Sequence, residues 1–249
     1  MLDDSPRFKM IELDETRSTN SFLRDYRPLQ PVDMTLVTAE YQTAGRGQGS
    51  NSWESERGKN LLFSLLVNPA ALPVVQAFVL SEAIALSIRE AVARFVHEEV
   101  TIKWPNDIYV GDSKIAGILI ENTLQGACVA RSIMGCGVNV NQENFVSDAL
   151  NPVSLRQLLQ RDIERSFVLD AIVEGFTRRY DLIQRSSFAP IVDEYRDMLY
   201  RRTGYHPFRD ADGTFEAEIA DVELSGHLVL RRSDGKLSRY AFKEVAFLQ

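Results

Sequence analysis

The sequence has few of the residues that build disulfide frameworks or zinc sites. Among its 249 residues are only two cysteines and three histidines. Cys128 and Cys136 lie an even number of positions apart on one expected strand, which favours small packing residues on one face over a disulfide or metal pair. The histidines are His97, His206 and His227, and they lack the spacing of metal ligands. We therefore expect neither a disulfide scaffold nor a zinc site.

A basic surplus and long apolar runs are absent as well. The formal net charge is -7, whereas a general nucleic-acid binder normally carries a basic balance or stripe. No apolar run is long enough to span a bilayer, and residues 1–5 lack the basic start and apolar core of a signal peptide. The overall composition, 45% hydrophobic and 25% charged, is ordinary for a globular protein. These features predict a cytoplasmic protein that binds neither nucleic acid nor a membrane.

The periodicity of apolar residues predicts an α+β fold. Strands are expected at 8–13, 34–41, 60–67, 101–110, 114–123 and 127–140, and helices at 19–27, 73–96, 168–184 and 188–202. Tight turns between the strands from 101 to 140 predict an antiparallel meander, and the apolar run 60–67 predicts burial on both faces. Ser154 with Gln157 forms a capping box that opens a short helix.

The pattern of apolar and turn-forming residues changes after residue 204. Short alternating strands are separated by Asp-Gly and Ser-Gly turns at close intervals. This pattern predicts a small β-barrel or sandwich over 205–249, beside a larger domain over 1–204.

A glycine-rich loop follows the second expected strand. The loop runs from Gln42 to about residue 55, and its glycines can present backbone N–H groups beside the guanidinium of Arg46, which suits a carboxylate or phosphate. The fingerprints of a P-loop and of a dinucleotide site are both missing. Trp53 closes the loop and could stack on a purine. The alternatives are a flexible connection for the loop and a core anchor for Trp53.

The segment from Lys103 to Glu121 breaks several local rules. Pro105 removes a donor from any sheet ladder, and Gly117 weakens the apolar strand in which it lies. Lys114 and Gly117 are near neighbours, so a cation and a place of close approach are presented together. The alternative for Lys114 is a solvated side chain after a turn.

Two further polar groups allow both structural and binding interpretations. Asn106 and Asp107 could cap a turn or hold a nucleotide's polar edge. Residues 16–20, which include Ser18, Thr19 and Asn20, form an N-cap run that opens the first helix, and the same hydroxyls and amide could bind a small polar ring.

Together these segments resemble the biotin protein ligase family. The resemblance rests on Ser18-Thr19-Asn20, on Gly45-Arg46-Gly47 with Trp53, on residues 103–107 with Lys114 and 117–119, and on 135–139. It extends over essentially the whole chain. It implies a mixed, largely antiparallel sheet with flanking helices, like that of class II aminoacyl-tRNA synthetases. The C-terminal module, including Phe242-Lys243-Glu244, is similar to the family's small SH3-like β-barrel.

The resemblance also implies a reaction and its partners. Biotin would be activated with Mg-ATP to biotinyl-5'-AMP, and the biotinyl group would then pass to a lysine of a carboxylase's biotin carboxyl carrier domain. Mg²⁺ would be held through the ATP phosphates, with no metal site in the protein. Whether the protein is a monomer or a homodimer is left open.

The resemblance also implies roles for individual residues, each at a position that matches a motif of the family. Lys114 and Arg46 would be the catalytic cations. The residues implied for biotin are Ser18, Thr19, Asn20, Gln42, Gly45, Arg46, Gly47, Lys114 and Gly117. The residues implied for ATP are Trp53, Lys103, Asn106, Asp107 and Asn139.

The chain departs from the family pattern in two ways. Residues 48–51 are uncharged, where the family often has further basic residues, and this puts the role of Gln48 in doubt. Too few residues precede Ser18 to form the N-terminal DNA-binding domain of some members, so a monofunctional ligase is expected.

Two rival functions stay open. A lipoate ligase or octanoyltransferase shares a related fold, although neither cysteine lies in an evident nucleophile setting. A non-catalytic biotin- or nucleotide-binding regulator is supported only by the uncharged loop.

Overall fold

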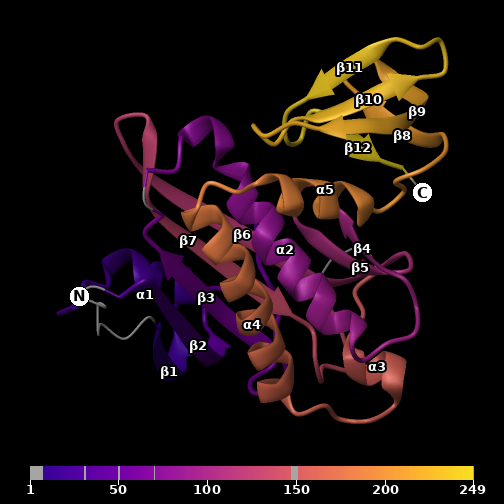
Figure 1. The fold of residues 1–249 in the computed structure, drawn as a ribbon. Coiled ribbons are helices and arrows are strands. Elements are labelled where there is room, and N and C mark those ends of the chain that lie inside the picture. Colours follow the sequence, from indigo (N-terminus) through magenta and orange to yellow (C-terminus); the bar gives the residue numbers. More distant parts are fainter. Residues whose placement is uncertain (1–7, 31, 50, 70, 147–150, 249) are drawn as a thin grey trace.

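The computed structural model describes residues 8–30, 32–49, 51–69, 71–146 and 151–248. Residues 1–5 and Ser50, which entered the sequence predictions, lie outside the described residues. Two sheets with helices between and around them make up the described chain (Figure 1).

The larger sheet has seven strands in the order β1-β2-β3-β7-β6-β5-β4. They are β1 Phe8–Thr16, β2 Met34–Gln42, β3 Leu61–Val67, β4 Val100–Lys103, β5 Asp107–Val110, β6 Ser113–Gln125 and β7 Cys128–Val138. Only β1 and β2 run parallel among these pairs, and β4 to β7 form an antiparallel meander. The mixed, largely antiparallel sheet and the burial of β3 on both faces confirm the sequence predictions.

The helices are mostly shorter than their sequence patterns. They are α1 Thr19–Asp25, the 3-10 helix η1 Val74–Gln76, α2 Phe78–Ala93, α3 Leu155–Leu159, α4 Arg165–Gln184 and α5 Ala189–Asp197. The capping box of Ser154 and Gln157 is present at α3. No helix in the described part of the chain is long and apolar enough to cross a membrane.

Two sequence predictions are corrected by the structure. The run 73–96 is a 3-10 turn followed by α2, and the run 101–110 is a hairpin of β4 and β5 rather than one strand. Proline explains the second difference, because Pro105 has no N–H for a ladder and a turn occupies 104–106. Of the two cysteines, both free, Cys136 is buried and Cys128 only partly so.

Helices cover both faces of the larger sheet. Leu23 on α1 packs in a small cluster with Val37 and Leu66. Leu36 and Leu65, their neighbours along the strands, belong to the main core, which includes much of α2 and α4. Because successive strand residues point to opposite faces, α1 lies on one face and α2 with α4 on the other (Figure 1).

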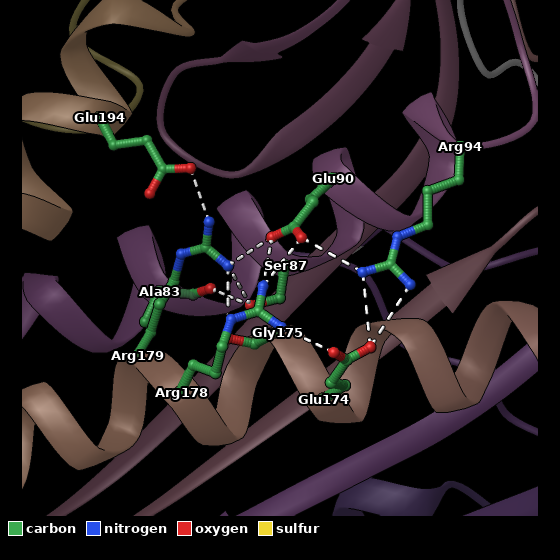
Figure 2. A network of polar contacts seen from close by, with 9 residues as sticks. All are labelled: Ala83, Ser87, Glu90, Arg94, Glu174, Gly175, Arg178, Arg179 and Glu194. Atoms are coloured by element: carbon green, nitrogen blue, oxygen red, sulfur yellow. Dashed lines mark hydrogen bonds and ion pairs between the residues drawn. The ribbon is translucent and has the colours of Figure 1, made fainter.

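An ion-pair network joins α2, α4 and α5 (Figure 2). Arg179 on α4 has a side chain only 8% exposed, and it bonds Glu90 of α2 and Glu194 of α5 at 3.0 and 2.6 Å. Arg178 also reaches Glu90, at 2.8 Å. The network holds α5 against the helical layer, and Tyr195 on α5 donates a hydrogen bond of 2.8 Å to Pro105 O. The helical layer thus supports the turn between β4 and β5.

The smaller sheet is antiparallel and has five strands in the order β11-β10-β9-β8-β12. They are β8 His206–Asp210, β9 Gly213–Val222, β10 Leu228–Arg232, β11 Leu237–Tyr240 and β12 Ala246–Phe247. Arg196 on α5 pairs with Asp221 at 2.7 Å, and Trp104 Nε1 donates to Gly226 O at 3.0 Å. The sheet is thereby fastened to α5 and to the β4–β5 turn. The division at residues 204 and 205 stays a prediction.

Glu82 on α2 is a buried carboxyl group near this junction. It is 1% exposed, and neither oxygen has a hydrogen-bond partner among the described residues. Burial raises its pKa from 4.5 to about 7, with Arg196 opposing and Asp221 adding to the rise. The native state therefore keeps a proton that the unfolded chain loses, so stability is lost as pH rises from 4.5 to about 7.

We predict that Glu82→Gln removes this loss. The free energy of unfolding of the variant, minus that of the unsubstituted protein, should be about 3 kcal/mol larger at pH 8 than at pH 4.5, because only the unsubstituted protein is destabilised as pH rises. Urea denaturation at both pH values measures the difference. The exposed Glu98→Gln serves as the control. The prediction is wrong if Glu82→Gln differs from the unsubstituted protein by the same free energy of unfolding at both pH values.

Candidate functional site

A cleft of about 650 Å³ brings the predicted site residues together. It is lined by Ser18, Thr19, Asn20, Gln42, Arg46, Gly47, Gln48, Trp53, Lys103, Asn106, Asp107, Lys114, Gly117 and Asn139. The predicted residue Gly45 is not part of the lining, and a Cβ there would come within 2.6 Å of Trp53 O. The lining comes from the α1 N-terminus, the loop after β2, the β4–β5 turn and strands β6 and β7.

Gln42, rather than Ser18, satisfies the start of α1. Its Oε1 accepts hydrogen bonds from Thr19 N at 2.8 Å and from Thr19 Oγ1 at 3.1 Å. Ser18 occupies the N-cap position but makes no side-chain capping bond, which corrects the N-cap interpretation of its hydroxyl. The Ser18 side chain is therefore not used for capping and lies at the cleft.

Asn20 is held by a buried polar cluster on the sheet. Its Oδ1 accepts from Ser64 Oγ at 2.6 Å, and its Nδ2 donates to Leu119 O at 3.2 Å and to Glu121 at 2.9 Å. The amide lies directly on Gly135, where a Cβ would overlap it. Gly135 thus makes room for a polar group whose orientation is fixed from three sides.

Arg46 is paired with a carboxylate of the protein. Its Nη1 and Nη2 donate to the two oxygens of Glu121 at 3.1 and 2.8 Å, and Arg24 reaches the same group at 2.6 Å. Burial raises the pKa of Glu121, but hydrogen bonds from Arg46, Asn20 and Arg24 outweigh it and hold that pKa below its usual value. Glu121 therefore keeps its negative charge and positions the guanidinium.

The glycine-rich loop bonds to itself. Gly47 N donates to Asn51 O at 2.7 Å, and Trp53 N donates to Gly45 O at 3.1 Å. The loop is therefore a structured turn rather than a loose connection. The N–H of Gly47, expected to face a ligand, is used within the loop.

The indole of Trp53 lies flat on two glycines. A Cβ on Gly117 would come within 2.9 Å of the ring, and one on Gly137 would overlap it. These glycines are directly paired across β6 and β7. The indole Nε1 is buried without a hydrogen-bond partner among the described residues. The two glycines therefore form a flat floor against which an aromatic ring lies.

Lys114 stands beside this floor. Its Nζ is 2.7 Å from Asp107 Oδ1 and 5.8 Å from the centroid of the Trp53 ring. A Cβ on Gly117 would lie 3.3 Å from Nζ, so the predicted juxtaposition of cation and glycine is present. Both ion-paired side chains are partly exposed, at 25% and 31%, to the cleft.

The asparagines are tied to backbone carbonyls at the edge of the cleft. Asn106 Nδ2 donates to Ile118 O at 2.7 Å, which fastens the β4–β5 turn to β6. Asn139 Nδ2 donates to Val153 O at 3.1 Å, and its Oδ1 is buried with no partner among the described residues.

Lys103 is enclosed by aromatic rings. Its Nζ lies 4.9, 5.5 and 5.8 Å from the centroids of Tyr109, Phe247 and Tyr200. Burial lowers the pKa of Lys103, against the opposing charge of Asp107. Lys103 lines the cleft, and its ammonium donates a hydrogen bond of 3.3 Å to Tyr109 Oη besides lying among the three rings.

Several residues gained a role at the cleft only from the structure. Gly135 and Gly137 belong to the segment 135–139 that carried the resemblance, and glycines two positions apart in a strand mark one face as open to close approach. Ser64 and Glu121 gave no signal of their partners, since a lone polar residue in an apolar strand has no evident one. Lys243, which reaches the cleft from the turn before β12, lies in the segment 242–244 that is similar to the family's C-terminal domain, but no role was expected for it. The described residues contain no group of three or more His, Cys, Asp and Glu that could hold a metal ion.

The fold of the described residues is that of solved biotin protein ligases. A biotin protein ligase from Aquifex aeolicus in complex with biotin and ATP superposes with a TM-score of 0.79 at 23% identity, over 97% of this chain and 99% of that one. One from Leishmania major in complex with biotinyl-5-AMP gives 0.65 at 23% identity, over 94% and 98%.

Sequence similarity defines the family. Residues 13–139 match the biotin/lipoate A/B protein ligase family. The bifunctional ligase/repressor BirA of Bacillus subtilis is 31% identical over 229 residues, which are 91% of this chain and 70% of that protein. A biotin–[acetyl-CoA-carboxylase] ligase of Paracoccus denitrificans is 28% identical, over 80% and 85%. The chain belongs to the biotin/lipoate A/B protein ligase family.

We predict that Gly137→Ala drives the Trp53 indole off the floor. The new methyl group would overlap the ring, which must then move toward water, since the glycine backbone cannot yield. Tryptophan emission should shift to longer wavelength. The same substitution in a Trp53→Phe background reports the contribution of Trp104 alone, and an unchanged spectrum of Gly137→Ala would contradict the arrangement.

Proposed function

We propose that this protein activates biotin with ATP to biotinyl-5'-AMP and transfers the biotinyl group to a lysine of a biotin carboxyl carrier domain. One observation carries the proposal. In a member of this family, a single cleft contains both a rigid polar cluster and the Lys114 ammonium. Relatives with biotin ligase names support biotin over lipoate as the substrate.

We assign biotin's ureido ring to the polar cluster near α1. A ureido group has donors and an acceptor, and Ser18, Thr19, Asn20 and Gln42 offer both kinds of partner. Hydrogen bonds among these groups pre-orient them, so little conformational freedom would be lost on binding. Gly117, which the Trp53 indole already covers, would pack near the ring.

Lys114 and Arg46 would act on the reacting anions. The biotin carboxylate attacks the α-phosphorus of ATP, forms a C–O–P anhydride bond and releases pyrophosphate. The two anions repel each other, so cations aimed at the developing charge lower the barrier. Each cation is now neutralised by a carboxylate, Asp107 or Glu121, at 2.7 and 2.8 Å. Partly exposed pairs are weak, so the ligand's anions can take over these partners at small cost.

We assign ATP to the part of the cleft between Trp53 and the β4–β5 turn. The Trp53 ring would stack against the purine, and Lys103, Asn106, Asp107 and Asn139 would surround the nucleotide. The buried Asn139 Oδ1 is an acceptor without a partner among the described residues, which suits an amino group. Mg²⁺ would enter with the phosphates, whose charge it neutralises. Gln48 stays without an assigned role.

A carrier domain would present its lysine amine to the mixed anhydride. The amine attacks the carbonyl carbon, an amide bond forms, and AMP leaves with the electron pair of the broken C–O bond. We also propose that the carrier domain belongs to a carboxylase, that the protein is cytoplasmic, and that it is a monomer or a homodimer.

The decisive experiment is a biotinylation assay with a purified biotin carboxyl carrier domain. Avidin should detect the carrier only when biotin, Mg²⁺ and ATP are all present, and pyrophosphate should accumulate. Pyrophosphate release with lipoate in place of biotin would favour a lipoate ligase instead. A blank avidin blot with bound biotin would favour a binding regulator.

We predict that Lys114→Ala lowers the rate of adenylate formation by about a hundredfold, because it removes a cation directed at the developing charge. Pyrophosphate release under saturating substrates measures it. The exposed Lys236→Ala is the matched control, and melting temperatures show that both variants fold. A near-normal rate for Lys114→Ala would refute the assigned role.

A further inference from the structure

Three of the cations at the cleft are already engaged by groups of the protein. Among the described lining residues, Arg46 is bonded to Glu121, and Lys114 is paired with Asp107. The Lys103 ammonium lies among three aromatic rings. A nucleoside triphosphate brings several negative charges, and residues 48–51 of the glycine-rich loop add no positive charge to balance them. The loop's own composition therefore leaves a deficit of cations.

The fourth cation comes from the smaller sheet. Lys243 lines the cleft, and a Cβ built on Gly49 would lie 2.6 Å from its Nζ. No described carboxylate forms an ion pair with Lys243. Its ammonium thus lies against the uncharged part of the loop, at a glycine whose missing side chain makes room for it.

The turn that carries Lys243 is held firmly. Ala241 N donates to Glu244 Oε2 at 2.6 Å, and Glu244 N donates to Ala241 O at 3.1 Å. Lys243 itself has φ of 70°, a conformation that costs a non-glycine residue energy and is kept where the surroundings require it.

The same turn is anchored to the larger domain. The rings of Phe242 and Trp104 lie 5.9 Å apart, and the Trp104 indole donates to Gly226 O at 3.0 Å. These contacts fix the turn against the segment next to Asn106, on the side of the cleft assigned to ATP. The cation is therefore presented by a rigid support rather than by a loose tail.

We propose that Lys243 binds the phosphate oxygens of ATP that leave as pyrophosphate, and so provides from the smaller sheet the charge that the glycine-rich loop lacks. The inference rests on the proposed function. Phosphate is favoured over the biotin carboxylate because Lys243 lies at Gly49 and next to the Trp104 segment, whereas the polar cluster assigned to biotin lies at α1.

The test is a set of substitutions at this position. Lys243→Asn removes the charge while tolerating positive φ, and Lys243→Arg keeps the charge. Pyrophosphate release is measured while ATP is varied at saturating biotin and while biotin is varied at saturating ATP. We expect Lys243→Asn to raise the KM for ATP by about tenfold, the loss of one charged hydrogen bond from an exposed side chain. The KM for biotin should change less than twofold, and Lys243→Arg should restore most of the affinity for ATP.

Control variants separate charge from folding. Lys236→Ala removes an exposed lysine of the same sheet and should leave both KM values unchanged.

Other outcomes overturn the proposal. The proposal is wrong if Lys243→Asn leaves the KM for ATP unchanged, or if Lys243→Asn and Lys243→Arg raise that KM equally. It is also wrong if Lys243→Asn raises only the KM for biotin. If the unsubstituted protein makes no pyrophosphate with biotin, the proposed function fails. If the unsubstituted protein is active and Lys243→Asn has the same KM for ATP, the proposed function stands and only the role of Lys243 is removed.

Discussion

The cleft depends on the close approach of side chains to bare backbone. On adjacent strands β6 and β7, Gly117 and Gly137 form a paired floor for the indole of Trp53, and Gly135 does the same for the amide of Asn20. Any side chain at these positions would displace those groups by its volume alone. The sheet is otherwise densely packed, so the cleft exists because the face that bears α1 lacks Cβ atoms at a few adjoining positions.

Charge in the cleft is arranged as exchangeable pairs. Lys114 and Arg46 are held by Asp107 and Glu121, with most of these groups partly open to the cleft. Such pairs keep the cations positioned without a fully buried charge, and under the proposed function an incoming anion would replace one carboxylate by another group of the same sign. Hydrogen bonds keep Glu121 ionised despite the burial that favours its neutral form.

The smaller sheet completes the cleft because of contacts far from the reacting groups. Trp104 bonds Gly226 and packs on Phe242, while the helical layer supports the neighbouring Pro105 through Tyr195. The β4–β5 turn is thus held from both sides. A segment distant in sequence thereby lies next to the glycine-rich loop.

Much of the fold and the segments that form the cleft could be predicted from the sequence, because hydrophobic periodicity and turn chemistry are local. Short patterns predict the strands, the meander and the segments around Ser18, Arg46 and Lys114. Helix ends were missed, since packing decides where a periodic run stops. The split of 101–110 was missed although Pro105 marks it in the sequence. Tertiary structure alone decided the partners. Whether Glu121 neutralises Arg46, and which chain segment brings Lys243 to the loop, depend on contacts between residues far apart in the chain, and no local pattern encodes them.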